Sequence, residues 1–411
     1  MSRAQLIAMA RHNMGHAAAG SIDQADQVLQ VPASHYYDPE RWQLERQRIF
    51  RRLPLMLALT CELPAPGDYK ATTCVGVPVL ISRAEDGAVR AFVNMCSHRG
   101  AVIMPEGRGN THRFTCPYHA WSYDQEGALT GIYAPRDFGD IDRGCYGLRA
   151  LPVQERAGMI WVTLDPGSTL DFDTFLAGYD ELLAQFGFGD WHLFEQRVLR
   201  GPNWKIAYDG YLDLYHLPIL HKATFGSQMP NQALYYAWGP HQRASSPDPG
   251  LRRLAALPES DWPTPALLGG VWTIFPHVSI ASFGGGGRSV MVSQLFPGDS
   301  PGESLTVQNY LMQRPPDAAQ AEEATQQFAL LERVVRDEDY ATGLKQQAAL
   351  RSGLKSHVLF GRNEAGGQRF HGWLDRLLET DDTDLNELFA RTARAQARQQ
   401  AWNDPQAQSA G

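Results

Sequence analysis

Cys96-Ser97-His98 and Cys116-Pro117-Tyr118-His119 decide the fold of this 411-residue chain. Each stretch holds one cysteine and one histidine, separated by only one or two residues. Together they suit a [2Fe-2S] cluster in which the two cysteines hold one iron and the two histidines hold the other. Neutral imidazoles in place of anionic thiolates raise the reduction potential of such a cluster, so that it can accept electrons from a ferredoxin. Two cysteines and two histidines would also suit a tetrahedral zinc ion.

The residues that follow each pair favour the iron–sulfur cluster, because a zinc site needs no such flanks. They are Arg99-Gly100-Ala101 after the first pair and Ala120-Trp121-Ser122-Tyr123-Asp124 after the second. With them the chain resembles the large (alpha) subunits of the Rieske non-haem iron aromatic-ring-hydroxylating oxygenases. The two loops of that family usually read Cys-x-His-Arg-Gly and Cys-Pro-Tyr-His-Gly-Trp. Ala120 stands where the family commonly has glycine, and we expect the loop to absorb this difference.

A second motif begins at Asn203-Trp204-Lys205 and continues from Asp209 to His221. It resembles the mononuclear iron motif of the same family. Ferrous iron that activates O2 is commonly held by two histidines and one carboxylate, with other positions left open. His216 and His221 are the predicted imidazole ligands. Five residues apart, they would not share a helix face, so we expect Pro218 to break the helix between them.

Asp213 lies three residues before His216 and is expected on the same helix face. A carboxylate there can accept the second imidazole N–H of His216 and fix its tautomer. The resemblance implies that Asp213 also bonds a cluster histidine of the neighbouring subunit, so that electrons cross a subunit interface. Asp209, one turn earlier, is treated only as a supporting polar group.

The third iron ligand is expected from the segment Arg336-Asp337-Glu338-Asp339-Tyr340. The resembling family carries its carboxylate ligand in a long C-terminal helix, and Asp339 fits that pattern best. A run of acids on a helix is more often a solvated face. Asp337 or Glu338 therefore remains an alternative to Asp339.

Composition excludes several other classes of protein. The formal net charge of -8 argues against nucleic-acid binding, which depends on clustered lysine and arginine. The three remaining cysteines, Cys61, Cys74 and Cys145, have no repeated spacing and imply no disulfide framework. Residues 1–20 lack the apolar core of a secretory signal, and no run of about eighteen apolar residues could span a membrane. We therefore expect a cytoplasmic protein.

The pattern of helix-like and strand-like residues divides the chain into three segments. Residues 1–52 are predicted as an N-terminal helical segment that packs with the catalytic domain, residues 53–165 as the Rieske [2Fe-2S] domain, and residues 166–411 as the catalytic mononuclear iron domain. Gly284-Gly285-Gly286-Gly287 lies between two strand-like stretches, Trp272–Phe283 and Ser289–Phe296. A nucleotide loop needs a strand on one side and a helix on the other, so a hairpin turn is predicted instead. The NAD(P)H-oxidising reductase is then a separate polypeptide.

The resemblance implies the fold, which is of the α+β class. We expect a β-rich Rieske domain inserted into a helix-grip (START-like) catalytic domain with an antiparallel sheet, assembled head to tail as a homotrimer with or without a small beta subunit. The implied activity is that of a terminal oxygenase component with one [2Fe-2S] cluster and one Fe(II) per subunit. It would take electrons from NAD(P)H through a ferredoxin or flavin reductase. With O2 it would monohydroxylate, dihydroxylate or oxidatively demethylate a small organic substrate, for which we expect an aromatic compound.

The alternative is a catalytically silent Rieske electron-transfer or ligand-binding protein. A stand-alone Rieske ferredoxin would end near residue 165, so the extra length and the pair His216 and His221 argue against it. A silent variant stays open if no carboxylate near Asp339 reaches the iron.

Overall fold

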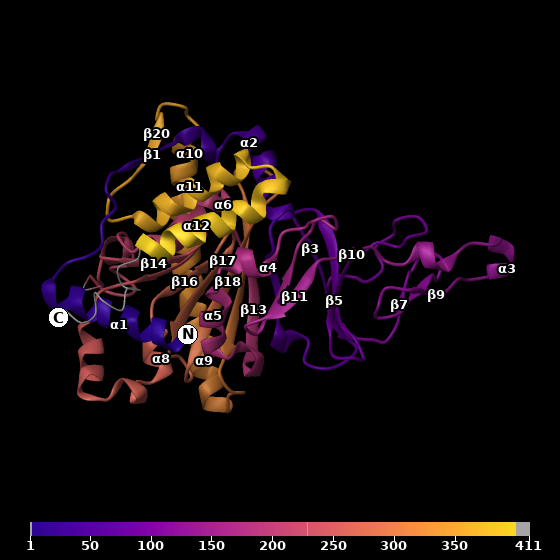
Figure 1. Cartoon of the computed structure of the whole chain (residues 1–411), viewed down its shortest axis with the longest axis horizontal. Coiled ribbons are helices and arrows are strands. Elements are labelled where there is room, and N and C mark those ends of the chain that lie inside the picture. The colour runs from indigo at the N-terminus through magenta and orange to yellow at the C-terminus, as the bar shows by residue number, and fades with distance from the viewer. Residues whose placement is uncertain (1, 228, 400–411) are drawn as a thin grey trace. The chain divides into compact units, whose positions relative to one another are not determined.

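The computed structural model describes residues 2–227 and 229–399, which form two compact units (Figure 1). The larger unit takes the chain up to Ile49, then Leu170–Gly187, and then the chain from Trp191 onward. The smaller unit takes Phe50–Thr169 together with the short segment Phe188–Asp190. The smaller unit is thus inserted into the sequence of the larger one.

The smaller unit is built from three antiparallel sheets. Its central strands contain β-branched and aromatic residues, which pack well on a pleated sheet. The five-stranded sheet has the order β10 (Ala150–Leu151), β5 (Val89–Val93), β4 (Val77–Arg83), β3 (Asp68–Cys74), β6 (Gly107–Asn110). The three-stranded sheets have the orders β11 (Val153–Arg156), β12 (Met159–Val162), β2 (Leu55–Leu59) and β7 (Phe114–Thr115), β8 (Ser122–Tyr123), β9 (Leu129–Gly131).

The core of the smaller unit includes the two predicted cluster cysteines. Cys96, after β5, and Cys116, after β7, are buried among Phe92, Phe114 and Trp121. Two sheets therefore meet around the cysteine–histidine loops, and aromatic side chains of the core pack against the cysteines of these loops.

The larger unit contains one seven-stranded antiparallel sheet. Its order is β13 (His192–Gly201), β19 (Ser304–Met312), β18 (Ser289–Pro297), β17 (Val278–Phe283), β16 (Val271–Ile274), β15 (His241–Ser245), β14 (Leu234–Trp238). Phe283 pairs with Ser289, so the glycine run between them is the predicted hairpin turn. The stretch Trp272–Phe283, predicted as one strand, is instead two strands around Phe275-Pro276, because proline cannot donate to a sheet ladder.

Helices α6, α11 and α12 lie over one face of this sheet (Figure 1). The helices of the larger unit are α1 (Ser2–Ala19), α2 (Pro39–Glu45), α4 (Phe172–Leu176), α5 (Tyr179–Leu183), α6 (Trp204–Leu212), α7 (Leu217–Leu220), α8 (Thr264–Leu267), α9 (Ala318–Arg333), the π-helical turn η9 (Val334–Tyr340), α10 (Ala341–Leu350), α11 (Ala365–Glu379) and α12 (Leu385–Gln399). A two-stranded sheet joins β1 (Leu29–Pro32) to β20 (His357–Phe360). Among the residues described, no helix has both the length and the apolarity needed to cross a bilayer.

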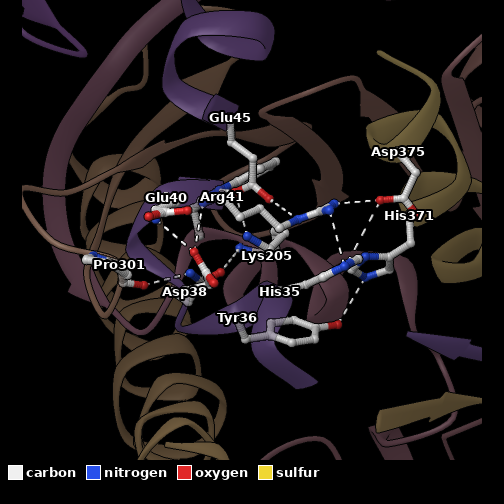
Figure 2. A network of polar contacts seen from close by, with 12 residues as sticks. His35, Tyr36, Asp38, Glu40, Arg41, Glu45, Lys205, Pro301, His371 and Asp375 are labelled. Carbon is white, nitrogen blue, oxygen red and sulfur yellow. Dashed lines mark hydrogen bonds and ion pairs between the residues drawn. The ribbon is translucent and has the colours of Figure 1, made fainter. Parts of the chain in front are cut away.

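A buried ion pair fixes α6 to α2. Lys205 Nζ lies 2.5 Å from Glu45 Oε2, and both side chains are fully buried. Glu45 also accepts hydrogen bonds from Arg41 Nε at 3.0 Å and from Trp204 Nε1 at 2.9 Å (Figure 2 shows the Arg41, Glu45 and Lys205 side chains). Asn203 caps α6 by accepting from the Lys205 N–H. The start of α6 is therefore held by charge, by hydrogen bonds and by a cap.

We expect Glu45→Gln to lower the free energy of unfolding of the larger unit by about 3–5 kcal/mol, because it leaves Lys205 buried without a counter-charge. Lys205→Met should cost less, since Glu45 keeps its bonds from Arg41 and Trp204. The measurement is the urea midpoint followed by tryptophan fluorescence, with the exposed Glu40→Gln as the matched control. A larger loss in Lys205→Met than in Glu45→Gln would contradict this reasoning.

Candidate metal centres

The two cysteine–histidine loops are built alike. In each, the backbone N–H of the cysteine (Cys96 or Cys116) donates at 2.8 Å to the carbonyl five residues further on. In each, the N–H four residues further on (Gly100 or Ala120) donates back to the cysteine carbonyl, at 2.9 and 3.0 Å. Gly100 has φ +77° and Ala120 has φ +56°, so both loops turn through the left-handed region at the same position. The loop accommodates alanine where the resembling family has glycine.

These loops bring the four predicted cluster ligands together. The thiols of Cys96 and Cys116 are buried and interact with each other. The rings of His98 and His119 lie with their centroids 4.7 Å apart. His98 Nδ1 is buried and has no hydrogen-bond partner among the described residues, a costly arrangement unless a ligand satisfies it. Two thiols, two imidazoles and an orphaned imidazole nitrogen fit a mixed-ligand [2Fe-2S] cluster.

Aromatic residues after the second loop hold this arrangement in place. The Trp121 ring stacks on His98 with centroids 4.9 Å apart and an interplanar angle of 11°. The Tyr123 hydroxyl lies 3.2 Å from Cys96 Sγ and accepts the N–H of Ser97 at 3.1 Å. Burial raises the pKa of the Cys96 thiol, and the bond to Tyr123 acts in the opposite direction. The sequence showed both aromatics as flanks of the motif but not these contacts.

Ala120→Gly should leave the stability of the smaller unit unchanged or raise it by up to about 1 kcal/mol, because glycine adopts a left-handed conformation without steric cost. Gly100→Ala should lower it by about 1 kcal/mol. A Cβ at Gly100 would meet only the Met95 side chain, at an ordinary 3.7 Å, so the cost lies in the backbone alone. Thermal loss of the visible cluster absorption measures both. Destabilisation by Ala120→Gly would refute the argument.

The segment with the predicted iron-binding histidines is not one helix. Helix α6 ends at Leu212, Asp213 is extended, and α7 begins after His216. The prediction that Asp213 and His216 share a helix face is therefore wrong. The break also comes before Pro218, which lies in the first turn of α7, where its missing N–H does no harm. Asp213 Oδ1 accepts the N–H of Tyr215 at 2.5 Å, a local turn that competes with continuation of the helix.

His216, His221 and Asp339 nevertheless converge. His216 Nε2 and His221 Nε2 are 3.2 Å apart, and Asp339 Oδ1 lies 3.6 Å from the first and 3.2 Å from the second. Three ligand atoms bound at about 2.1 Å to one metal lie about 3.0–3.4 Å from one another. Of the three acids left open by the sequence, Asp339 is the one that joins the two histidines. The donor set fits a two-histidine, one-carboxylate site for ferrous iron.

Two further carboxylates hold the other nitrogens of these imidazoles. Asp213 Oδ2 lies 3.1 Å from His216 Nδ1, so the contact predicted from the sequence exists despite the broken helix. Glu338 Oε2 lies 2.5 Å from His221 Nδ1, and the Thr224 hydroxyl donates to Glu338. Burial lowers the pKa of His221, but its bonds to Asp339 and Glu338 outweigh burial and raise the pKa overall. Both Nε2 atoms are thereby turned toward the convergence point.

The contact of Glu338 with His221 was missed from the sequence, which weighed Glu338 only as an alternative ligand. Glu338 and Asp339 both lie in the π-helical turn η9, where neighbouring side chains are separated by a smaller angle than in an α-helix. Two successive acids can therefore face the same site. Asp337, the other alternative, is exposed and pairs with Arg336.

Asp209 does not contact His216 or His221 through any hydrogen bond seen in the described residues. It accepts instead from the Tyr36 hydroxyl at 2.8 Å and bonds His371 Nε2 at 2.9 Å. Tyr36 and His371 also contact each other at 3.1 Å (Figure 2). Asp209 and His371 thus join α6 to its neighbours.

Glu338→Ala is expected to weaken binding of Fe(II) at the His216–His221–Asp339 site by about 10–100-fold, since the tautomer of His221 is no longer fixed. Asp337→Ala, one residue away and exposed, is the matched control and should change nothing. Competition of cluster-loaded protein with a chelator of known affinity gives the constants. Equal effects of the two substitutions would show that Glu338 has no specific role.

Comparison with known proteins follows the same division of the chain. Residues 54–143 match the family model of the Rieske [2Fe-2S] domain. Residues 188–380 match the family model of the ring hydroxylating alpha subunit (catalytic domain).

Curated relatives are oxygenase large subunits. The glycine betaine monooxygenase oxygenase subunit of Chromohalobacter salexigens is 29% identical over 248 residues, which cover 60% of this chain and 53% of that protein. The anthranilate 1,2-dioxygenase large subunit of Burkholderia cepacia is 33% identical over 212 residues, which cover 48% of this chain and 48% of that protein. The chain thus spans about half the length of the curated relatives it matches.

Solved structures match most of the chain in fold. A quaternary ammonium Rieske monooxygenase, described in terms of carnitine oxidation by gut microbiota and inter-subunit electron transfer, gives a TM-score of 0.71 at 20% identity, covering 85% of this chain and 96% of that one. Naphthalene 1,2-dioxygenase from Rhodococcus sp. bound to indole gives 0.70 at 19% identity, covering 92% and 98%. The predicted α+β fold, a Rieske domain with an antiparallel-sheet catalytic domain, is confirmed.

Proposed function

We propose that this chain, which belongs to the family of Rieske oxygenase alpha subunits, is the terminal oxygenase component of a multicomponent enzyme. The observation that carries the proposal is the convergence of His216, His221 and Asp339 in a chain that also builds the paired cysteine–histidine loops. A carrier of electrons alone would need only the loops.

The proposed residue roles follow from the donor sets. Cys96, His98, Cys116 and His119 would hold the [2Fe-2S] cluster, and His216, His221 and Asp339 would hold Fe(II). When bound, the cluster would supply single electrons and the ferrous iron would supply the site for O2 activation.

Asp213 is proposed as the link between the two centres. Its carboxylate is an acceptor, so His216 carries its proton on Nδ1 and presents the Nε2 lone pair to the metal position. The Asp213 side chain is 26% exposed and so remains accessible to a second imidazole. We propose that this imidazole is a cluster histidine of the neighbouring subunit in a head-to-tail trimer. The inter-subunit electron transfer described for a structural relative supports this arrangement.

For the substrate we propose a small aromatic compound. Phe225 lies beside His221, with ring centroids 5.6 Å apart. It also packs against an apolar cluster that includes Met291, Tyr310 and Phe328. Such side chains bury an apolar ring well. Relatives are named for anthranilate and for glycine betaine, so aromatic acids and quaternary amines are the two classes to compare.

The electrons are proposed to come from NAD(P)H through a separate flavin reductase, with or without a ferredoxin. The glycine run Gly284–Gly287, for which the sequence predicted a hairpin turn and not a phosphate loop, is a hairpin turn. This supports a nucleotide site on another polypeptide.

Iron content separates the proposal from its rival. Fully loaded protein should contain about three irons per chain, two in the cluster and one at the His216 site, and His221→Ala should retain about two. Turnover is then tested with NADH, a surrogate reductase and ferredoxin, and panels of aromatic acids, polycyclic compounds and quaternary amines. Product mass should show oxygen derived from O2, or loss of a methyl group. Two irons in the intact chain and no product from any panel would favour the silent electron carrier.

Asp213→Asn tests the link between the centres. We expect an intact cluster spectrum and unchanged iron content, with turnover largely abolished because the asparagine amide cannot replace the carboxylate between two imidazoles. Asp337→Asn serves as the control on an exposed carboxylate and should retain full turnover. Turnover near normal in Asp213→Asn would rule out the proposed link.

A further inference from the structure

A second group of two histidines and one aspartate lies in the larger unit, outside the segments that carry His216 and Asp339. His12 and His16 are one turn apart on α1, and Asp23 follows shortly after that helix ends. His12 Nε2 and His16 Nε2 are 3.2 Å apart, and Asp23 Oδ1 lies 3.8 Å and 3.3 Å from them. Three atoms on the corners of a tetrahedron around zinc, with bonds of 2.0–2.1 Å, are about 3.3–3.4 Å apart. The triangle of donor atoms therefore matches a metal site in size.

Hydrogen bonding determines which nitrogen of His12 carries the proton. The Tyr236 hydroxyl donates to the carbonyl of Met9 at 3.2 Å, so its proton is not available to His12. We therefore assign His12 Nδ1, 3.2 Å from that hydroxyl, as the donor. In the neutral imidazole the other nitrogen is an acceptor. The lone pair of His12 Nε2 thus faces His16 and Asp23.

His16 has the same arrangement. Its Nδ1 lies 2.9 Å from the Ser21 hydroxyl, which leaves Nε2 directed at His12 and Asp23. The three side chains are about one fifth to two fifths exposed, at 22%, 20% and 43% for His12, His16 and Asp23. They are therefore held in place yet open to an ion from solution. Three acceptor atoms therefore face one another, and the outer nitrogen of each imidazole is hydrogen-bonded, as in a metal ligand set.

We propose that His12, His16 and Asp23 form a third metal site, which binds one divalent transition-metal ion, with zinc as the best match. Imidazole donors favour zinc over magnesium or calcium. His12 and Asp23 also line a surface pocket together with Tyr235, Arg369 and Arg376, which leaves room for a water or an anion as the fourth ligand. The ion joins α1 to the segment that leads to β1. The proposal does not depend on the oxygenase function, because none of these residues belongs to the two centres described above.

The test uses the full chain, loaded with cluster and iron and equilibrated with a zinc buffer. One additional zinc per chain is expected by elemental analysis. Asp23→Asn and His16→Gln should lose it with iron unchanged, whereas Asp339→Asn should lose iron and retain this zinc. Asp26→Asn, an exposed carboxylate in the same segment, is the matched control. Equal zinc uptake by the intact chain and Asp23→Asn, or no uptake by either, would overturn the proposal.

A second measurement separates metal binding from a simple proton shared between the two histidines. Tyr236→Phe removes the group that orients His12 and should raise the zinc dissociation constant about 10–100-fold. Zinc should raise the thermal midpoint of the intact chain and leave that of Asp23→Asn unchanged. A thermal midpoint insensitive to zinc in both proteins would show that His12, His16 and Asp23 are held together by protons alone.

Discussion

The buried ion pair between Lys205 and Glu45 is the constraint on which the larger unit depends. Charges removed from water are tolerated only where their partners are placed well, so this pair allows α2 and α6 one relative position. Asp213 and His216 follow directly after the end of α6 at Leu212. The point from which the chain leads to His216 is therefore held by an interaction at the opposite end of α6.

One feature is shared by the His216–His221–Asp339 site and the His12–His16–Asp23 group: the imidazole nitrogen that faces away from the convergence point has a hydrogen-bond partner. Asp213 and Glu338 serve His216 and His221, while Tyr236 serves His12. In the smaller unit the Trp121 ring stacks on His98 instead and orients its ring plane. Fixing the outer nitrogen selects the tautomer and lowers the entropy lost when a metal binds. These outer partners distinguish a prepared ligand set from histidines that are merely near one another.

The sequence predicted the structural features that depend on residues close together in the chain. Its predictions were wrong where a side chain competes with the backbone for hydrogen bonds. The paired loops and the hairpin at Gly284–Gly287 follow from local patterns. The fold with its antiparallel sheet was implied by the family resemblance, and it is confirmed. The ligand roles of His216, His221 and Asp339 remain predictions that the geometry supports. The continuous helix through Asp213 was wrong because a turn of its own side chain ends α6. The role of Glu338 was missed because helical periodicity assumes an α-helix where the chain forms a π-helical turn.

Because of the π-helical turn η9, the chemistry of the site also depends on the length of the helical segment that contains this turn. Helices α9 and α10 form one continuous rod through η9, which has a wider hydrogen-bonding step than its neighbours. Deleting a single residue there would allow an ordinary α-helix, a change that looks harmless to backbone bonding. Each residue beyond the deletion would nevertheless turn by about 100° around the axis. The number of residues in this helical segment therefore determines which side chains face the candidate iron site. Relatives that differ in length here cannot be aligned by composition alone.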